Sequence, residues 1–189
     1  RGLGDVYKRQ EKETWGMSGY AVNVSESCKE AFDRTHPYLD ISRSLVIENV
    51  LSKKMILTRS TEFDASEEMT QGKSKILLSI GRFCDAKNFD NVPDICRRLV
   101  EDGLDVKWYL IGYGGDEPLI RQKIAEAGMQ KRVIILGKKD NPYPYMRACD
   151  LYVQPSRYEG KAVTVREAQL LGKPVVITNY ATSGSQLED

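Results

Sequence analysis

Hydrophobic positions in the second half of the chain fall into short apolar runs separated by longer amphipathic stretches. These runs have the length and composition of buried strands. They lie at residues 75–80, 106–111, 133–136, 151–154 and 174–177. Four of the five end in or next to a glycine or proline. We therefore expect a ligand crevice at the carboxyl ends of these strands.

The stretches between the runs carry apolar residues along one side of a helix. Residues 92–99 hold four of them at the i, i+3, i+4, i+7 spacing of one helix face, and residues 120–127 mark a second helix. Further helices are predicted around 145–148 and from 159 to about 171. Strands that alternate with helices imply a parallel sheet with right-handed crossovers. The sequence thus predicts a Rossmann-like α/β fold, a parallel sheet flanked by helices.

The first part of the chain is less regular. Short β-prone runs at 20–24 and 44–47 predict two strands, and Ser27 with Glu30 forms a capping-box pattern that predicts the start of a helix. The stretch 59–73 is rich in turn residues and contains four acidic side chains and no basic one between its ends. We interpret it as the centre of a linker.

Both ends of the chain differ from those of an ordinary domain. Residues 5–10 resemble the translated end of a transposon adapter used in sequencing-library preparation, so residues 1–10 are interpreted as a non-native scar. The last residues, 186–189, follow a strand-and-loop pattern without a closing helix. These features predict a fragment that is cut at both ends.

Composition excludes several classes of protein. With 28 basic and 27 acidic residues the net charge is +1, which argues against nucleic acid or an anionic membrane as a partner recruited by charge. The four cysteines are scattered and the chain has one histidine, so we expect reduced thiols and no metal site. No apolar run is long enough for a transmembrane helix.

Two cations follow the first of the regular strands. Gly81 and Arg82 come directly after it, and Lys87 lies five residues further on. Arginine can bridge two phosphate oxygens and lysine adds a point charge, so this loop suits a diphosphate. A solvated surface loop is the alternative interpretation.

Two carboxylates lie close to the last long helix. Glu159 falls in the loop before it and Glu167 about one turn inside it. Carboxylates accept hydrogen bonds from hydroxyl groups, which makes sugar and ribose hydroxyls natural partners. The helix N-terminus near residues 162–163 offers N–H groups to a phosphate. Taken alone, Glu167 is better explained as part of an exposed helix face.

A third motif is the glycine-rich sequence at residues 112–115. It lacks the third glycine of a dinucleotide fingerprint, because position 117 is Glu117. Gly112 and Gly114 either let the backbone approach a ligand closely or form a tight turn. Nearby aromatic residues and one cysteine are interpreted as packing residues: Tyr143, Tyr145, Tyr158 and Cys149.

Taken together, these segments resemble the donor-binding half of a family-4 retaining glycosyltransferase of the GT-B fold. The resemblance covers residues 75–189, with weaker support from 20–51. The motifs occur in family order: Ser79-Ile80-Gly81-Arg82 with Lys87, Ile111-Gly112-Tyr113-Gly114, Val133-Ile134-Ile135-Leu136-Gly137, Ala148-Cys149-Asp150-Leu151, Gln154-Pro155-Ser156-Arg157-Tyr158-Glu159-Gly160, Arg166-Glu167-Ala168 and Gly172-Lys173-Pro174-Val175-Val176. Glu159-Gly160-Lys161-Ala162 departs from the Gly-Phe-Gly that follows the glutamate in many relatives.

The resemblance implies a domain organisation and a role for each matching residue. Residues 11–51 would be a remnant of the N-terminal acceptor-side domain, 52–74 a linker and 75–189 the donor-binding domain. The catalytic residues would be Arg82, Lys87 and Glu159. The two cations would bind the diphosphate of a nucleotide sugar and stabilise the leaving nucleotide, Glu159 would bind the transferred sugar, and Glu167 would bind the ribose. The other expected donor-binding residues are Gly81, Gly112, Gly114, Gly160, Lys161, Ala162 and Val163.

The resemblance further implies a function for the parent protein. A sugar would pass from a nucleotide-diphosphate sugar to a glycan or lipid-linked acceptor, without a metal or other cofactor, in surface polysaccharide or glycolipid synthesis. The protein would be cytoplasmic, either free or in peripheral contact with the inner face of the membrane through the missing N-terminal part. The fragment itself is expected to be inactive. A non-catalytic nucleotide-sugar-binding module is the main alternative; a glycoside hydrolase and a dehydrogenase are disfavoured.

Overall fold

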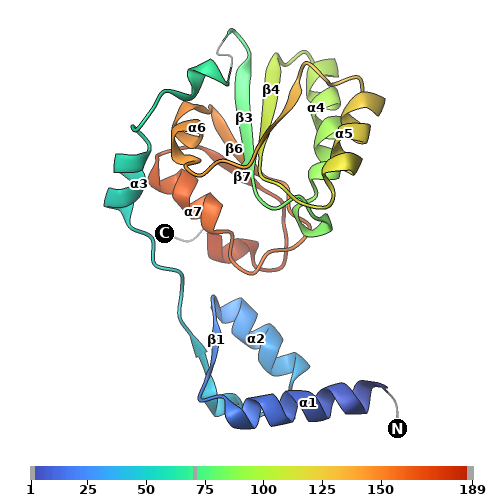
Figure 1. Cartoon of the computed structure of the whole chain (residues 1–189), viewed down its shortest axis with the longest axis vertical. Helices are drawn as coiled ribbons and strands as arrows, with labels where there is room; N and C mark the ends of the chain where they lie inside the picture. Colours follow the sequence, from blue (N-terminus) through green and yellow to red (C-terminus); the bar gives the residue numbers. More distant parts are fainter. Residues whose placement is uncertain (1–2, 70–71, 187–189) are drawn as a thin grey trace. The chain divides into compact units, whose positions relative to one another are not determined.

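The computed structural model describes residues 3–69 and 72–186, and the chain divides into two compact units. The first unit ends at Val50 and the second begins at Leu51. Figure 1 shows both, with the sequence coloured from blue to red.

The first unit contains two helices and a small parallel sheet. Its helices are α1 (Leu3–Met17) and α2 (Glu26–Thr35), and its strands β1 (Ala21–Asn23) and β2 (Ser44–Val46) pair with Ala21 opposite Ser44. The two predicted strands are confirmed. The predicted capping box is wrong, because Ser25 rather than Ser27 accepts the hydrogen bond from the Cys28 N–H, and α2 begins earlier. Residues 5–10, the expected scar, lie within α1.

The second unit is built on a five-stranded parallel sheet. Its strands are β3 (Lys75–Ile80), β4 (Val106–Ile111), β5 (Val133–Gly137), β6 (Leu151–Gln154) and β7 (Val175–Ile177). They lie side by side in the order β5-β4-β3-β6-β7. All pairings are parallel, as predicted.

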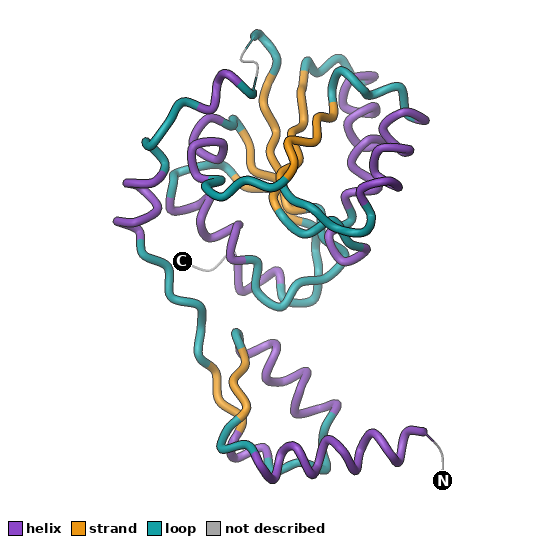
Figure 2. The backbone as a smooth tube through the Cα atoms, in the orientation of Figure 1, coloured by secondary structure: helices purple, strands orange, loops and turns teal. Residues whose placement is uncertain are grey.

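Helices cover both faces of this sheet (Figures 1 and 2). One face carries α4 (Val92–Glu101) and α5 (Glu117–Glu126). The other carries α3 (Lys53–Arg59), α6 (Tyr143–Ala148) and α7 (Val163–Leu170). The last helix was predicted to begin at residue 159, but α7 begins at Val163. Residues 155–162 form a loop that ends at the N-cap residue Ala162.

The core forms as two layers because successive strand residues point to opposite faces. In the central strand β3, Ile76 and Leu78 pack against the α3, α6 and α7 side, whereas Leu77 packs against the α4 and α5 side. Each of these side chains is at most 5% exposed. A strand buried on both faces reads as a continuous apolar run, which explains why the sequence pattern located β3 so well.

The segment expected as a linker, residues 52–74, lies within the second unit. Its helix α3 buries Ile56 completely and contacts α6 and α7. The Asn141 side chain donates to the carbonyl of Arg59 at 2.9 Å, and Glu68 accepts from both Lys139 and Tyr145. These bonds join the acidic stretch to the sheet domain.

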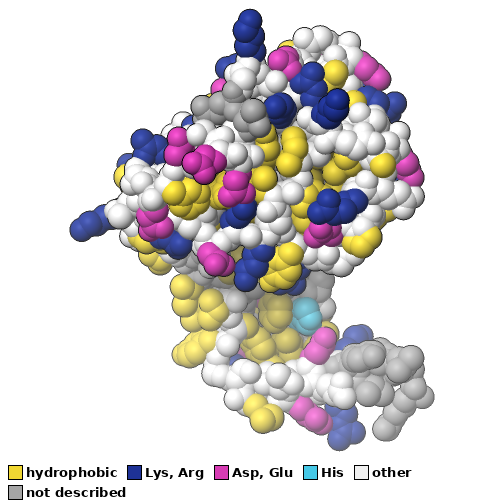
Figure 3. All heavy atoms as spheres, turned by 45° about the horizontal axis from the view of Figure 1, so that its top comes forward, with side chains coloured by type: hydrophobic (Ala, Val, Ile, Leu, Met, Phe, Trp, Pro, Cys, Tyr) yellow, Lys and Arg dark blue, Asp and Glu magenta, His cyan; other side chains and the backbone are white. Residues whose placement is uncertain are grey.

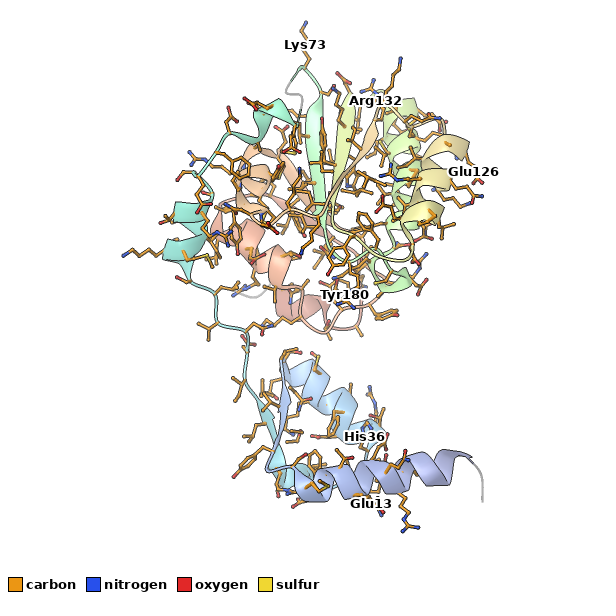
Figure 4. All side chains as sticks on the ribbon, viewed as in Figure 1. Glu13, His36, Lys73, Glu126, Arg132 and Tyr180 are labelled. Carbon is orange, nitrogen blue, oxygen red and sulfur yellow. The ribbon has the colours of Figure 1, made fainter. Side chains whose placement is uncertain are left out.

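The order of the strands determines where a ligand site can form. From β3 the chain builds outward through β4 to β5 and then returns to β6 on the other side of β3. The loops that follow β3 and β6 therefore leave the sheet in different directions, and such a switch point is the usual ligand site of an open α/β sheet. In Figure 4, Lys73 and Arg132 mark the amino-terminal edge of the sheet and Tyr180 the opposite edge.

Candidate functional site

The loops that follow β3 and β6 are held together at the switch point. The Asn88 side chain donates to the carbonyl of Pro155 at 2.8 Å, and the Arg157 N–H donates to the carbonyl of Ala86 at 2.9 Å. Asn88 has a left-handed backbone, with φ at 59°, which ends the turn that carries Lys87. The loop after β3, which carries Arg82 and Lys87 and is called the cationic loop below, is thus bound to the loop that carries Glu159.

The glycines after β4 permit a close approach to the cationic loop. A Cβ on Gly112 would lie 1.8 Å from the carbonyl oxygen of Gly81, and a Cβ on Gly114 would lie 2.1 Å from that of Phe83. Phe83 in turn donates its N–H to the carbonyl of Tyr113 at 2.8 Å. Contact between two stretches of backbone accounts for glycine at both positions.

Lys87 and Glu159 form an ion pair between the two loops. The Lys87 Nζ lies 2.5 Å from Glu159 Oε1, and the two side chains are 20% and 11% exposed. The stem of Lys87 lies over Gly81, where a Cβ would be 3.2 Å from Lys87 Cε. Three residues that the sequence singled out are therefore neighbours in the structure.

The described residues engage one oxygen of the Glu159 carboxylate, Oε1. Besides Lys87, Oε1 accepts from the Ser156 hydroxyl at 2.6 Å and from the Gln154 amide at 3.0 Å. Gln154 and Ser156 are buried, and the amide of Gln154 also donates to the Ser156 hydroxyl at 2.8 Å. Glu159 Oε2 has no hydrogen-bond partner among the described residues. The carboxylate is thus held by Oε1, while Oε2 can still accept a hydrogen bond from a ligand.

The second carboxylate, Glu167, is also held by one oxygen. The Tyr143 hydroxyl donates to Glu167 Oε1 at 2.9 Å. Burial raises the pKa of Glu167 above its ordinary value, and the hydrogen bond from Tyr143 only partly offsets that effect. Burial and the bond to Glu167 likewise raise the pKa of Tyr143 to about 12.

The charges of both carboxylates affect the pKa of one buried residue, Tyr152. Its hydroxyl donates to Gln154 Oε1 at 2.8 Å. Burial is the main cause of its raised pKa, and the negative charges of Glu167 and Glu159 raise it further. Both carboxylates are therefore close enough to the end of β6 for their charges to affect the same hydroxyl.

The remaining predicted residues lie around this centre. Gly160 and Lys161 lead from Glu159 into α7, whose N-cap residue Ala162 makes no side-chain capping bond. N–H groups in the first turn of a helix have no intrahelical partners. Arg82 is exposed and makes no hydrogen bond or ion pair with any residue that the structure describes. Its guanidinium is therefore available to a ligand.

Other interpretations from the sequence have mixed outcomes. Tyr143, Tyr145 and Cys149 are buried, as predicted, whereas Tyr158 is 61% exposed and the packing role assigned to it is wrong. Gln154 and Ser156 were not predicted as site residues. A buried glutamine at the end of an apolar strand was a signal that could have identified Gln154, because a buried amide needs partners.

Metal and membrane features are absent from the described residues. No group of histidine, cysteine or acidic side chains within 3–69 and 72–186 has an arrangement that could hold a metal ion. Across the same residues, no helix combines the length and the apolar character needed to cross a bilayer. On the face drawn in Figure 3, basic and acidic side chains are interspersed.

Comparison with known proteins identifies the family. Residues 60–189 match the family model described as "Glycosyl transferases group 1". That match covers more than half of the chain, so the chain belongs to this family. The sheet, its flanking helices and the loops after β3 and β6 are thus those of a glycosyltransferase domain.

The curated relatives share less than a third of their aligned residues with this chain. The chain is 26% identical over 175 residues to the lipopolysaccharide core biosynthesis mannosyltransferase LpsB of Rhizobium meliloti, which covers 87% of this chain and 48% of that protein. It is 29% identical over 115 residues to an N-acetylgalactosaminyltransferase of Campylobacter jejuni that acts on a diphospho-undecaprenol-linked sugar, covering 61% of this chain and 31% of that protein. The chain therefore spans half or less of the length of these relatives.

Solved structures share the fold. The crystal structure of HepE from Anabaena in complex with UDP and glucose superposes with a TM-score of 0.78 at 20% identity, over 91% of this chain and 47% of that one. The glycosyltransferase WaaG, involved in lipopolysaccharide biosynthesis, superposes with a TM-score of 0.68 at 16% identity, over 87% of this chain and 46% of that one. These likenesses confirm the expected α/β architecture, with its parallel sheet flanked by helices.

Proposed function

We propose that the parent protein is a retaining glycosyltransferase of family 4 and that this chain carries its nucleotide-sugar-binding half. The supporting observation is the joining of a cation, Lys87, and a carboxylate, Glu159, at the switch point of the sheet. A diphosphate needs the first and a sugar hydroxyl needs the second.

Each residue has a role in this proposal. Arg82 and Lys87 bind the diphosphate, together with backbone N–H groups of Lys161, Ala162 and Val163. Glu167 binds the ribose hydroxyls and Glu159 the transferred sugar, each through the oxygen that no described residue engages. Gly81, Gly112, Gly114 and Gly160 shape the backbone around the donor.

The chemistry follows from the charges. As the bond between the sugar and the diphosphate breaks, negative charge grows on the leaving phosphate oxygen. Lys87, already held in place by Glu159, and the exposed Arg82 stabilise that charge, and a cation that is positioned in advance does so without the cost of reorganising water. We assign charge stabilisation to these cations rather than to a metal ion. Transfer also requires the acceptor to be held in line by the second wall of the cleft.

The relatives support a proposal for the acceptor. LpsB is named for lipopolysaccharide core biosynthesis, and the Campylobacter protein acts on a diphospho-undecaprenol-linked sugar. We propose that the parent protein uses a glycan or lipid-linked acceptor in surface polysaccharide or glycolipid synthesis. It would work in the cytoplasm, with peripheral membrane contact made by its acceptor-side part.

A ligand screen and one substitution test this proposal. The intact parent protein is screened by thermal shift against uridine, guanosine and adenosine diphosphates and their sugars. The ligands that carry one of these bases should raise its melting temperature. Arg82→Ala should keep the fold and lower transfer roughly 100-fold, the usual cost of removing one charge-stabilising donor. Arg98→Ala, which removes an exposed arginine on α4, is the matched control. Donor binding without transfer would indicate a non-catalytic binding module, and unchanged turnover in Arg82→Ala would remove the phosphate role.

A further inference from the structure

Tyr180 lies in the loop after β7, and its backbone is fixed beside Glu159. Its N–H donates to the carbonyl of Thr178 at 2.9 Å, and its carbonyl accepts from the Ser183 N–H at 2.9 Å. On either side of it, the Thr178 hydroxyl donates to the carbonyl of Ser156 and the Thr182 hydroxyl donates to that of Glu159 at 2.7 Å. These hydrogen bonds hold the loop of Tyr180 against the Glu159 loop. Figure 4 shows Tyr180 at the edge of the sheet opposite Lys73 and Arg132.

The hydroxyl of Tyr180 is buried and finds no partner in the described part of the chain. The residue is 4% exposed, and its hydroxyl makes no hydrogen bond with any described residue. Tyr143, Tyr145 and Tyr152, which are comparably buried, donate their hydroxyls to Glu167, Glu68 and Gln154. A buried polar group that lacks a hydrogen bond is costly and calls for an explanation, of which a ligand is one.

The charge of Glu159 reaches this hydroxyl. Burial is the first cause that raises the pKa of Tyr180, to about 12, and the negative charge of Glu159 is the second. Tyr180 is therefore protonated at neutral pH and can donate. Glu159 Oε2 can only accept, and the two groups are not bonded to each other. The described residues thus leave a donor and an acceptor in the same neighbourhood without a hydrogen-bond partner.

We propose that Tyr180 is a sugar-binding residue whose hydroxyl donates a hydrogen bond to an oxygen of the same sugar that Glu159 Oε2 holds. An alcohol suits this pair, because one hydroxyl group can donate to a carboxylate and accept from a tyrosine at once. A fully ionised phosphate oxygen can accept from Tyr180 but has no proton to give Glu159. This inference rests on the proposed function and extends it by one residue.

The proposal predicts a difference between two ligands that share a nucleotide. In the parent protein, the affinity of Tyr180→Phe for a nucleoside diphosphate should be unchanged, whereas its affinity for the corresponding nucleotide sugar should fall about threefold to tenfold, as for one neutral hydrogen bond. Isothermal titration calorimetry with UDP and UDP-glucose measures both affinities, and GDP with GDP-mannose replaces them if the screen favours guanosine. The melting temperature of the variant should not fall, because no residue in 3–69 or 72–186 makes a hydrogen bond with the hydroxyl that is removed.

Tyr145→Phe is the matched control. It deletes the same atom from an equally buried tyrosine, but one whose hydroxyl donates to Glu68 at 2.5 Å. It should therefore lower the melting temperature by about 2–4 °C and leave the ratio of the two affinities unchanged.

Each outcome decides between distinct conclusions. A selective loss of nucleotide-sugar affinity in Tyr180→Phe supports the proposal. Equal affinities in the variant and the unmodified protein, or an equal loss for both ligands, overturn it and leave the proposed function standing. If the unmodified protein binds neither ligand pair, the proposed function fails and the role of Tyr180 fails with it.

Discussion

Replacing Gly112 by alanine tests the close backbone approach that brings the glycine loop to the cationic loop. The added Cβ would lie 1.8 Å from the carbonyl oxygen of Gly81, a separation that real Cβ atoms do not show. To reach an ordinary contact of about 3.4 Å, one of the two loops has to move by roughly 1.5 Å. Neither loop can yield at a flexible end, because the clash is with backbone.

The cost can be worked from the bonds that such a shift disturbs. Gly81 and Gly112 donate their N–H groups to the carbonyls of Ile111 and Gly137, each at 3.0 Å. Losing one such bond costs about 1 kcal/mol. Overpacking adds about 1–3 kcal/mol, and the φ of 151° at Gly112 strains an alanine further. We expect Gly112→Ala to lower the free energy of unfolding of the second unit by about 3–5 kcal/mol, a large share of an ordinary domain's stability.

Urea denaturation followed by tryptophan fluorescence measures this change. The chain has two tryptophans, so a Trp15→Phe background leaves Trp108, which is 2% exposed in the second unit, as the reporter. Gly115→Ala is the control, since a Cβ there meets nothing within 4 Å; it should change stability by less than about 0.5 kcal/mol. Equal stability of the Gly112 and Gly115 variants would refute the reasoning.

Two further predictions concern the pH dependence of stability. Burial raises the pKa of Glu167 above 4.5 in the folded state. The stability that the neutral carboxyl contributes is therefore full below pH 4.5 and is lost as the pH rises through the raised pKa. In urea titrations, the stability of Glu167→Gln relative to the unmodified chain should increase from pH 4.5 upward, and a pH-independent difference would contradict this. Asp150 accepts from the Ile76 N–H at 2.8 Å, and this bond is the main cause that holds its pKa below 3.8. Asp150→Asn should cost about 1 kcal/mol at pH 7 and progressively less below pH 3.8, whereas an equal cost at pH 3 and pH 7 would argue against the assignment.

The sequence predicted most of the second unit because its signals were local. The bounds of β3, β4 and β6 match the apolar runs to the residue, since strands buried on both faces are apolar throughout. The start of α2 was misplaced because two serines, Ser25 and Ser27, offered the same capping chemistry. Only the folded backbone selects between them.

The site was predictable only in part. Gly81, Lys87 and Glu159 could be proposed because the carboxyl ends of parallel strands share one edge of the sheet. The bond between Tyr143 and Glu167 joins α6 to α7 across 24 positions of sequence, and no periodicity predicts it. Gln154 could have been identified from its place at the end of an apolar strand, but its bond to Glu159 could not, because Glu159 lies in an irregular loop. The functional assignments of all these residues stay predictions until the variants are measured.

The way Glu159 is held has a stereochemical consequence. Three donors on a single oxygen restrict rotation of the carboxylate, because turning it weakens all three bonds together, and a half-turn only exchanges two equivalent oxygens. Its remaining oxygen therefore faces one fixed direction. Under the proposed function, a sugar hydroxyl would meet that oxygen from one direction, so this anchored side chain would distinguish an equatorial hydroxyl from an axial one.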